Sequence, residues 1–401
     1  MGKQMNVPKL RFPELGEWSN IKIGEVGTIV TGNTPPTAND EYYNGIYQFV
    51  SPFDISEKRF IEQTKTTLTK LGFDKGRKIR IGSSLFVCIG STIGKVAQNK
   101  VECITNQQIN AVIPNENFSD DFIYSLLEYH SLKIKMLAGE QAVPIINKTT
   151  FSNYSLSIPF YPEQNKISSF LLAIDEYLIQ LKKKKSLLEQ YKKGVMQQLF
   201  SQELRFINEN GKHFVDWEDK SMGNITYKVG KKNKDGIKYP IYSINNKEGF
   251  KPQSEQFDGV DSNTRGYDIS MYKIIKKNSF AYNPARINVG SIGYSGELND
   301  IIISSLYVCF KTTSEIDDQF LLHYTSTPQF NNAVLTNVEG GVREYLFYEN
   351  FSNIEIQLPS IPEQLKIVDF LNSLDEKINQ CSSQIEKMQL WKKGLLQQMF
   401  V

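Results

Sequence analysis

The sequence predicts an α+β fold in which two globular mixed α/β blocks are separated by two long α-helices that pair as a coiled coil. Three observations lead to this prediction. Residues 159–200 and 359–400 match at 17 of 42 positions without a gap. Both segments carry a heptad pattern of apolar residues, and the segments before them mix strand-like and helix-like patterns. The chain is therefore an internal repeat, with one block before each helix.

The long helices are predicted from apolar residues that alternate at spacings of three and four. Pro-Glu-Gln opens both copies, at residues 162–164 and 362–364. Proline and glutamate both suit the first turn of a helix. Each helix would span about 39 residues, or roughly 58 Å. A seam this narrow needs a partner, and the other copy is the nearest one. The predicted coiled-coil seam consists of Ile167, Leu171, Ile174, Leu178, Leu181, Leu188, Ile367, Leu371, Leu374, Ile378, Ile385 and Met388.

Length and charge limit the class of protein. A chain of 401 residues is long enough for two or three domains. The 46 basic and 44 acidic residues nearly cancel, so any nucleic-acid contact must come from local clusters. The four cysteines lie far apart without a Cys-x-x-Cys pair, which argues against disulfides and zinc and fits a reducing cytoplasm. The sequence shows no signal core and no apolar run of membrane-spanning length, so we expect a cytoplasmic protein without a membrane partner.

The chain divides into an N-terminal arm (1–17), a first block (18–158), a central helix region (159–205), a second block (206–358) and a C-terminal helix region (359–401). Leu-Arg-Phe occurs at residues 10–12 and again at 204–206, and a tryptophan follows each time. The N-terminus thus begins where a helix copy would have ended. The repeat is therefore circular in character, because an arm, a globular block and a long helix follow one another twice.

Both blocks are predicted to be mixed α and β. In the first block we expect strands at 26–30, 47–50, 84–89 and 111–114, and a helix at 121–138. In the second block we expect strands at 239–244, 279–282 and 301–310, and a helix at 318–330. Short identical segments align the two blocks with each other. Examples are Gly-Ser at 90–91 and 290–291, and Phe-Ser-Asn at 151–153 and 351–353. Elsewhere the blocks diverge, which indicates one binding module used twice on different targets.

Motifs for catalysis are incomplete. The segment 90–95 is not a phosphate-binding Walker A loop, because three residues rather than four separate its glycines and Val96 follows the lysine. We interpret it as a tight glycine turn whose amides can hold a DNA phosphate. Asn-Pro-Ala-Arg at 283–286 lacks the second proline and the aromatic residue of the Asn-Pro-Pro-Tyr motif of amino-methyltransferases. The sequence shows no catalytic carboxylate cluster, nucleophile elbow or Cys/His arrangement, so we predict no catalytic residue and no metal ligand.

Polar residues in the loops suit base edges and phosphates. Asn and Gln pair with adenine and Arg with guanine in the major groove. Taken singly, each such residue is better explained by ordinary surface solvation. Taken together, beside turn glycines in both blocks, they predict a DNA-reading surface. The predicted DNA-binding residues are Asn33, Thr34, Lys70, Lys75, Arg77, Lys78, Ser91, Lys95, Asn106, Gln107, Gln108, Lys231, Lys232, Asn245, Asn246, Arg286, Asn288 and Arg343.

The combination of these features resembles the specificity subunit of a type I restriction–modification system. Pro-Glu-Gln opens each leucine-rich helix, and each variable block begins near a tryptophan and Ile-Gly-Glu-Val (23–26), or more weakly Met-Gly-Asn-Ile (222–225). The resemblance covers essentially the whole chain. It implies that the blocks are target-recognition domains and that the helices are spacer regions packed antiparallel, in a pseudo-twofold internal repeat.

The resemblance also implies a function. Each recognition domain would read one half of a bipartite double-stranded DNA site, and the helix pair would set the spacer between the halves. Two methyltransferase subunits, which methylate adenine N6, would bind the helix faces and ends, and restriction subunits would cleave DNA. We expect no cofactor in this chain, and S-adenosylmethionine, Mg²⁺ and ATP on the partner subunits.

Two other functions stay open on the sequence alone. A DNA methyltransferase or nuclease with degenerate motifs would bind S-adenosylmethionine as an isolated chain. A coiled-coil adaptor that does not touch DNA would leave the DNA affinity of its complex unchanged after charge reversal at Lys75, Arg77 and Arg286.

Overall fold

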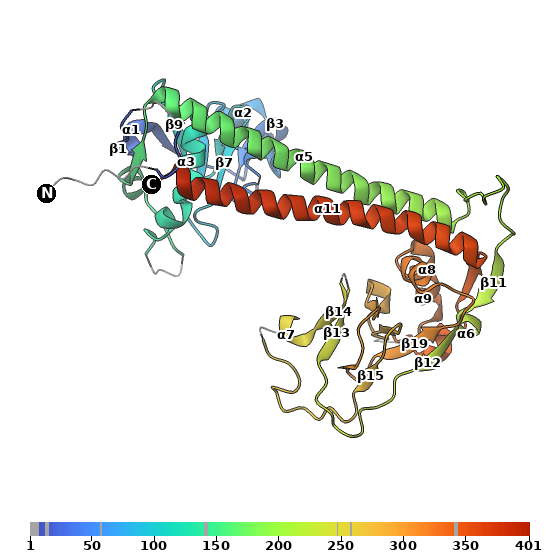
Figure 1. Cartoon of the computed structure of the whole chain (residues 1–401). Helices are drawn as coiled ribbons and strands as arrows, with labels where there is room; N and C mark the ends of the chain where they lie inside the picture. The colour runs from blue at the N-terminus through green and yellow to red at the C-terminus, as the bar shows by residue number, and fades with distance from the viewer. Residues whose placement is uncertain are drawn as a thin grey trace. The chain divides into compact units, whose positions relative to one another are not determined.

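The computed structural model describes residues 8–12, 16–56, 58–139, 143–246, 248–256, 259–340 and 344–401. The chain forms two compact units: unit 1 comprises residues 1–184 and 381–401, and unit 2 comprises residues 185–380. The two long helices, α5 (Tyr161–Phe200) and α11 (Ile361–Met399), each start in one unit and end in the other (Figure 1). Each unit therefore combines a globular block with the first part of one long helix and the last part of the other.

Unit 1 contains a sheet of strand order β2-β9-β6-β7-β4, a sheet of order β5-β3-β8, and the pair β1-β10. Its strands are β1 (Ser19–Lys22), β2 (Gly27–Thr31), β3 (Tyr43–Val50), β4 (Phe60–Ile61), β5 (Thr66–Leu68), β6 (Ser84–Val87), β7 (Val96–Asn99), β8 (Cys103–Thr105), β9 (Ile109–Pro114) and β10 (Ser155–Ile158). Its shorter helices are α1 (Ile23–Val26), η1 (Asp40–Tyr42), α2 (Lys70–Phe73), α3 (Asp120–Lys135) and α4 (Lys148–Ser152).

Unit 2 contains a sheet of order β12-β19-β16-β17, a sheet of order β14-β13-β18-β15, and the pair β11-β20. Its strands are β11 (Glu218–Ser221), β12 (Thr226–Val229), β13 (Ile241–Asn245), β14 (Gly249–Pro252), β15 (Lys273–Ile275), β16 (Phe280–Tyr282), β17 (Ile292–Tyr294), β18 (Ile301–Ile303), β19 (Val308–Thr312) and β20 (Glu355–Leu358). Its shorter helices are α6 (Met222–Ile225), α7 (Gln253–Gln256), η2 (Ile287–Val289), α8 (Asp318–Tyr324), α9 (Pro328–Asn337) and α10 (Tyr348–Phe351).

The two blocks share one strand plan. In unit 1, β3 runs parallel to β8 and antiparallel to β5, and in unit 2, β13 runs parallel to β18 and antiparallel to β14. The order β2-β9-β6-β7 corresponds to β12-β19-β16-β17. Gly90 follows β6 and Gly290 follows β16, with φ of 96° and 87° that favour glycine. The predicted glycine turns are confirmed at equivalent positions.

Two predicted elements of the second block are wrong in detail. The single strand expected at 301–310 is two strands, β18 and β19, in different sheets. A turn at Ser304 separates them. Because apolar residues lie on both sides of this turn, hydrophobic periodicity does not reveal it. The single helix expected at 318–330 is α8 and α9. Pro328 lacks an N–H, so the first helix stops before it, and Thr327 caps the second helix.

The N-terminal arm completes unit 1 in the way that the residues after α5 complete unit 2. The Leu10 N–H donates to the Gln398 carbonyl at the end of α11, at 2.9 Å. The Leu204 N–H donates to the Gln198 carbonyl at the end of α5, at 3.0 Å. In unit 1 the two ends of the chain thus make the backbone contact that residues close together in the sequence make in unit 2. The circular repeat is confirmed.

An aromatic cluster joins each helix end to its block. In both clusters a tryptophan meets the block phenylalanine edge-on, with ring centroids 6.3 Å apart, and the last phenylalanine of the helix region lies within 5.6 Å of the same ring. Such edge contacts add to the burial of apolar area. The clusters are Trp18–Phe122–Phe400 in unit 1 and Trp217–Phe320–Phe200 in unit 2.

The glutamate of each Pro-Glu-Gln is a fully buried carboxylate paired with the arginine of Leu-Arg-Phe. Glu163 and Glu363 have 0 % of their surface exposed. Arg11 donates to both oxygens of Glu163, at 3.0 and 2.6 Å, and Arg205 donates to both oxygens of Glu363, at 3.2 and 3.0 Å. This fork geometry is typical of a strong arginine–carboxylate pair. It attaches the arm segment to the start of the long helix.

The glutamine of the motif joins the long helix to a helix of the block. The Gln164 Oε1 atom accepts from the Ser119 N–H at 3.0 Å, and Gln364 Oε1 accepts from the Asp317 N–H at 2.7 Å. Ser119 and Asp317 are the N-cap residues of α3 and α8. Both glutamines also donate to a proline carbonyl just before the long helix. The motif therefore sets the position of each block on its helix.

Within each unit the helix segments pack antiparallel. In unit 1, Lys392 of α11 contacts Asp175 of α5 at 2.8 Å and Glu128 of α3 at 2.8 Å. Burial alone would lower the pKa of Lys392, but these carboxylates raise it. In unit 2, Lys192 of α5 contacts Asp375 of α11 at 2.6 Å. Of the predicted seam residues, Leu188, Ile378 and Met388 are half-buried and the others are buried.

We expect Gln364→Leu to destabilise unit 2. The substitution leaves the partly buried N–H of Asp317 without its acceptor, which costs about 2 kcal/mol of unfolding free energy. Urea unfolding followed by circular dichroism measures the change. Gln384→Leu, at an exposed position of the same helix, is the matched control. An equal loss in both variants would contradict the role assigned to Gln364.

We expect the stability of unit 1 to fall as the pH drops from 6.5 toward 4. His130 is only 4 % exposed and lies 3.1 Å from the Tyr154 hydroxyl. Burial lowers its pKa from 6.5 to about 4, so the unfolded state binds the proton more tightly across this window. The loss at pH 5 relative to pH 7 is about 2 kcal/mol. Thermal unfolding at the two pH values should show it in the native chain and in His213→Phe, an exposed control, but not in His130→Phe.

Candidate nucleic-acid interface

In unit 1, several strands end at one edge of the block. Strands β3 and β8 are parallel, so their carboxyl ends meet there, and β2 and β6 end beside the start of β9. The turns that follow these strands are 31–34, 50–54, 88–95 and 105–109. We name this set of turns the unit 1 edge. Chain reversals at strand ends expose side chains and backbone amides to solvent.

Five of the predicted DNA-binding residues come together at or beside the unit 1 edge. The Thr34 hydroxyl donates to the Gln107 side chain at 2.8 Å. The Asn33 amide donates to the Lys75 carbonyl at 3.1 Å and accepts from the Arg77 N–H at 2.9 Å. These bonds hold three separate segments against one another. The ammonium group of Lys75 takes no part in them.

Four more of the predicted residues belong to the same edge. The Asn106 amide donates to the Gln108 side chain at 2.9 Å, and Gln108 reaches the Ile89 carbonyl at 3.4 Å, next to the glycine turn. Ser91 is exposed in that turn, and Lys95 donates from Nζ to the Ile55 carbonyl at 3.0 Å. The edge therefore presents amides, a hydroxyl and cations side by side. These groups are complementary to base edges and phosphates.

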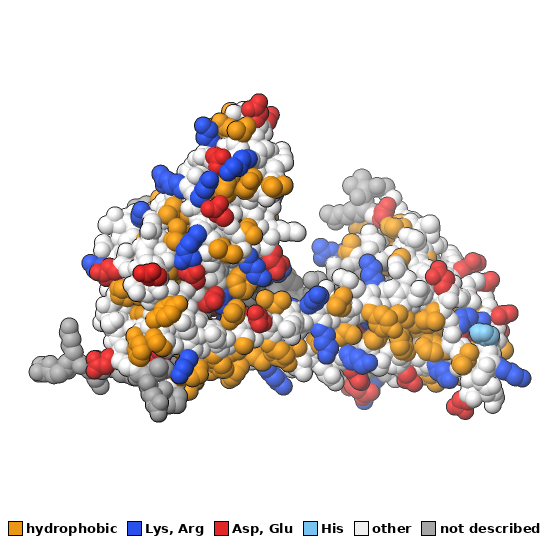
Figure 2. Space-filling view, turned by 90° about the horizontal axis from the view of Figure 1, so that it is seen from above, with side chains coloured by type: hydrophobic (Ala, Val, Ile, Leu, Met, Phe, Trp, Pro, Cys, Tyr) orange, Lys and Arg blue, Asp and Glu red, His pale blue; other side chains and the backbone are white. Residues whose placement is uncertain are grey.

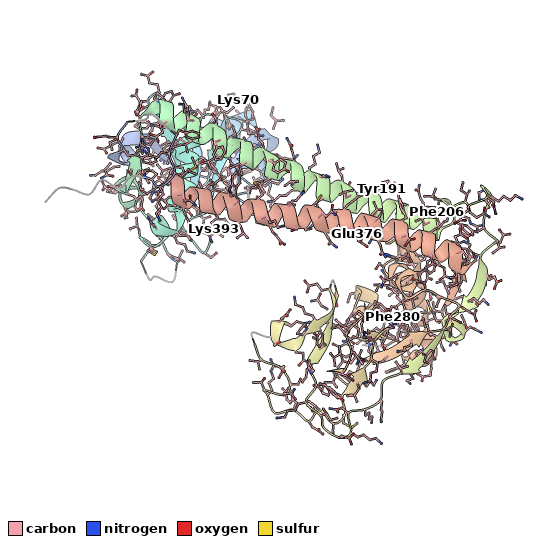
Figure 3. All side chains as sticks on the ribbon, viewed as in Figure 1. Lys70, Tyr191, Phe206, Phe280, Glu376 and Lys393 are labelled. Atoms are coloured by element: carbon pink, nitrogen blue, oxygen red, sulfur yellow. The ribbon has the colours of Figure 1, made fainter. Side chains whose placement is uncertain are left out.

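Lys70 and Lys78 belong to a separate ion-pair group at α2. Both contact the carboxylate of Asp74, at 3.0 and 2.8 Å, and both lie near the ring of Phe73. Hydrogen bonds from Lys78 and Lys70 lower the pKa of Asp74. Figure 3 labels Lys70 on the outside of unit 1. Their charges are thus partly neutralised, unlike that of Lys75.

Unit 2 presents an equivalent edge at the ends of β12, β13, β16 and β18, whose turns are 230–233, 245–249, 283–291 and 304–307. We name it the unit 2 edge. Asn246, Asn288 and Gly290 line a groove of about 670 Å³ together with Lys192 and His323. Burial lowers the pKa of His323, which keeps the ring neutral at pH 7. The groove brings two predicted residues against the helix segments of the same unit.

Of the other predicted residues of unit 2, Arg286 lies near Tyr307, and Lys231 and Lys232 lie beside β15. Burial raises the pKa of Tyr307, and the nearby charge of Arg286 opposes that rise. The Lys231 carbonyl accepts from Ile274, and Lys232 forms a β-bridge with Lys273. Both lysine side chains are exposed.

Asn245 and Arg343 are the remaining predicted residues of unit 2. The Asn245 side chain accepts from the Glu248 N–H at 3.3 Å, within the turn after β13. Arg343 lies outside the described residues, so its place at the edge stays a prediction.

Sequence reasoning missed residues that the structure places at these edges. Phe53 lies in the turn after β3, and the ammonium group of Lys65, which precedes β5, lies over its ring. Lys273 donates to the Tyr307 carbonyl at the turn after β18. Phe53 is a single aromatic residue in a loop segment, and it fits none of the base-edge or phosphate-binding residue types from which the DNA-reading surface was predicted. The useful signal was its place, directly after a predicted strand and before a loop with cations.

On the face that Figure 2 shows, Lys and Arg side chains are interspersed with Asp and Glu, as the net charge of +2 suggests. Across the described ranges, no group of three or more His, Cys, Asp and Glu side chains is placed to hold a metal ion. No helix in the part of the chain that the structure describes is long and apolar enough to cross a membrane.

The chain is similar over most of its length to known sequences. It is 23% identical to the MjaIX specificity subunit of a type I restriction enzyme from Methanocaldococcus jannaschii, over 95% of this chain and 92% of that protein. It is 31% identical to the HindI specificity subunit from Haemophilus influenzae, over 38% of this chain and 35% of that protein.

Solved structures share the fold. The S subunit of a type I restriction–modification system from M. genitalium superposes with a TM-score of 0.60 at 15% identity, over 98% of this chain and 99% of that one. A chain from a type I restriction–modification system studied for complex assembly superposes with a TM-score of 0.58, over 96% of this chain and 98% of that one. At this identity the likeness concerns the fold alone.

The sequence pattern of one family, described as type I restriction modification DNA specificity domain, matches twice, at residues 16–190 and 215–387. Each match covers one block and the first part of the long helix that follows it. The chain therefore belongs to this family, as a non-catalytic specificity subunit with two target-recognition domains.

Proposed function

We propose that this chain reads a bipartite double-stranded DNA site, with the unit 1 edge on one half and the unit 2 edge on the other. The observation that carries the proposal is the shared strand plan with different side chains at equivalent turns. The turn after β6 carries Ser91 and Lys95, whereas the equivalent turn after β16 carries Arg286 and Asn288. One scaffold with two sets of polar groups suits two different base sequences.

The long helices would recruit the subunits that act on the DNA. Tyr191 and Trp391 occupy equivalent positions of the repeat and are about half exposed. Three residues further along, a side-chain carbon at Gly194 or Gly394 would meet nothing within 4 Å. Figure 3 labels Tyr191 on α5 and Lys393 on α11. Exposed aromatic rings beside open helix surface are typical of interface centres.

The partners that fit are two modification subunits, one for each unit, with restriction subunits joining them. In this proposal S-adenosylmethionine is held by the modification subunits, and Mg²⁺ and ATP are held by partner subunits as well. The assembly would act on DNA in the cytoplasm. A direct titration of the isolated chain with S-adenosylmethionine tests the assignment of that cofactor, since saturable binding would count against it.

A block exchange tests whether each block reads its own half of the DNA site. Residues 18–158 are replaced by the first block of a relative with a different target, and the complex with its modification subunits is used to methylate genomic DNA. We expect one half of the methylated site to change, because each edge contacts its own half. Sequencing of methylated adenines reads the outcome. A change in both halves, or in neither, would refute the proposal.

Charge reversal tests the contact with phosphates. Lys75→Glu with Arg77→Glu removes two cations of the unit 1 edge. We expect the complex to bind its site more weakly and the slope of log affinity against log salt to fall by about one for each phosphate that is no longer neutralised. Fluorescence anisotropy over a salt series measures both. Lys70→Glu with Lys78→Glu, the cations already paired with Asp74, is the matched control and should have a smaller effect.

A further inference from the structure

Phe53 is an exposed aromatic residue in a rigid turn of the unit 1 edge. It is 77 % exposed, although a phenylalanine gains about 1.5–3 kcal/mol from burial. The turn spans Ser51 to Asp54 and is closed by the Asp54 N–H donating to the Ser51 carbonyl at 3.0 Å. Pro52 occupies the second position, where its restricted φ suits a turn. The ring is thus presented to solvent by a preformed backbone.

The carboxylate of Asp54 locks this turn. One oxygen accepts from the Ser51 N–H at 2.8 Å and from the Ser51 hydroxyl at 2.7 Å. The other oxygen accepts from the Lys65 N–H at 2.7 Å. The flanking residues Val50 and Ile55 are fully buried in the core. A turn anchored on both sides and crosslinked by one side chain holds the Phe53 ring in place at little entropic cost on binding.

The surroundings of the ring are cationic and polar. The Lys65 ammonium lies 5.1 Å from the ring centroid, and the Lys95 ammonium binds the carbonyl of Ile55 two residues further on. The Asn106 N–H donates to the Val50 carbonyl at 3.0 Å, which connects the turn 105–109 to the turn that holds Phe53. Cations and amides around a ring suit the phosphates and bases of DNA.

The two repeats differ at this position. The strand equivalent to β3 is β13, and the turn after it reads Asn246, Lys247, Glu248 and Gly249, without an aromatic residue. A surface that binds the same kind of subunit in both units should keep its anchor in both. A residue that reads one target sequence has no such constraint.

We propose that Phe53 is a specificity-determining residue that places its ring against a base of the first half-site. This inference rests on the proposed function and adds a contact that is neither a hydrogen bond nor a charge. Two base features can receive the ring: the face of an unstacked base at a base step, and the methyl group of a thymine in the major groove. Both are apolar contacts to a base.

The test uses Phe53→Ala and Phe53→Tyr in the full complex with modification subunits. The probe is a duplex that carries the site identified by sequencing of methylated adenines. We expect Phe53→Ala to weaken binding about tenfold, as for the loss of one stacked base, with the salt slope unchanged. Phe53→Tyr keeps the ring and should stay within about twofold of the native chain. Ile81→Ala, a 59 % exposed apolar residue that precedes β6 rather than following a strand of the edge, is the matched control.

Two probes separate the base features. In duplexes with 2-aminopurine at successive positions of the first half-site, a rise in fluorescence that Phe53→Ala abolishes identifies stacking at an opened step. In duplexes with uracil in place of thymine, a loss of affinity in the native chain that is absent in Phe53→Ala identifies the methyl contact. Either result supports the proposal.

Other outcomes overturn it. If Phe53→Ala binds DNA as tightly as the native chain, while the block exchange still changes one half-site, the role of Phe53 fails and the proposed function stands. If Phe53→Ala instead loses the modification subunits on size-exclusion chromatography, the ring is a protein contact. If the native complex shows no site preference at all, the proposed function itself fails. An unchanged melting temperature shows that the variant is folded.

Discussion

The buried carboxylate at the start of each long helix is the interaction on which the rest of the structure depends. A charge without exposure to solvent is stable only with a well-placed partner, and removal of one partner from such a pair costs about 3–5 kcal/mol. Glu163 and Glu363 find that partner in the arginine of an arm segment. The adjacent glutamines bind the N-caps of α3 and α8. Three segments therefore meet at one point in each unit, and the block has a defined position on its helix.

The circular order of the repeat follows from the same joint. The arm of unit 1 is the N-terminus, and the arm of unit 2 is the continuation of α5, yet both carry Leu-Arg-Phe and both bind a buried glutamate. Each globular core is completed by the end of a long helix region, with Phe400 in unit 1 and Phe200 in unit 2. A contact made by neighbours in one unit is made by the two chain termini in the other.

This construction separates the constant parts of the molecule from the variable ones. The helix starts, aromatic clusters and interhelical ion pairs recur in both units with similar distances. The edges differ, with Asn106, Gln107 and Phe53 in unit 1 against Asn246, Asn288 and Arg286 in unit 2. Turns at strand ends tolerate such differences because their side chains face solvent and do not pack in the core. Under the proposed function, a new target sequence would require changes only there.

The sequence by itself determined the duplicated helices, their apolar seam and the circular order, because periodicity and repeated text are local properties of a chain. It also placed the glycine turns, and with them most residues of the unit 1 edge. Only the tertiary structure showed that residues 301–310 cross between two sheets, and that Lys70 and Lys78 pair with Asp74 while Asn33 binds Lys75 and Arg77. The tertiary structure alone placed Phe53 beside Lys65. These facts depend on contacts between distant segments, which hydrophobic periodicity does not encode.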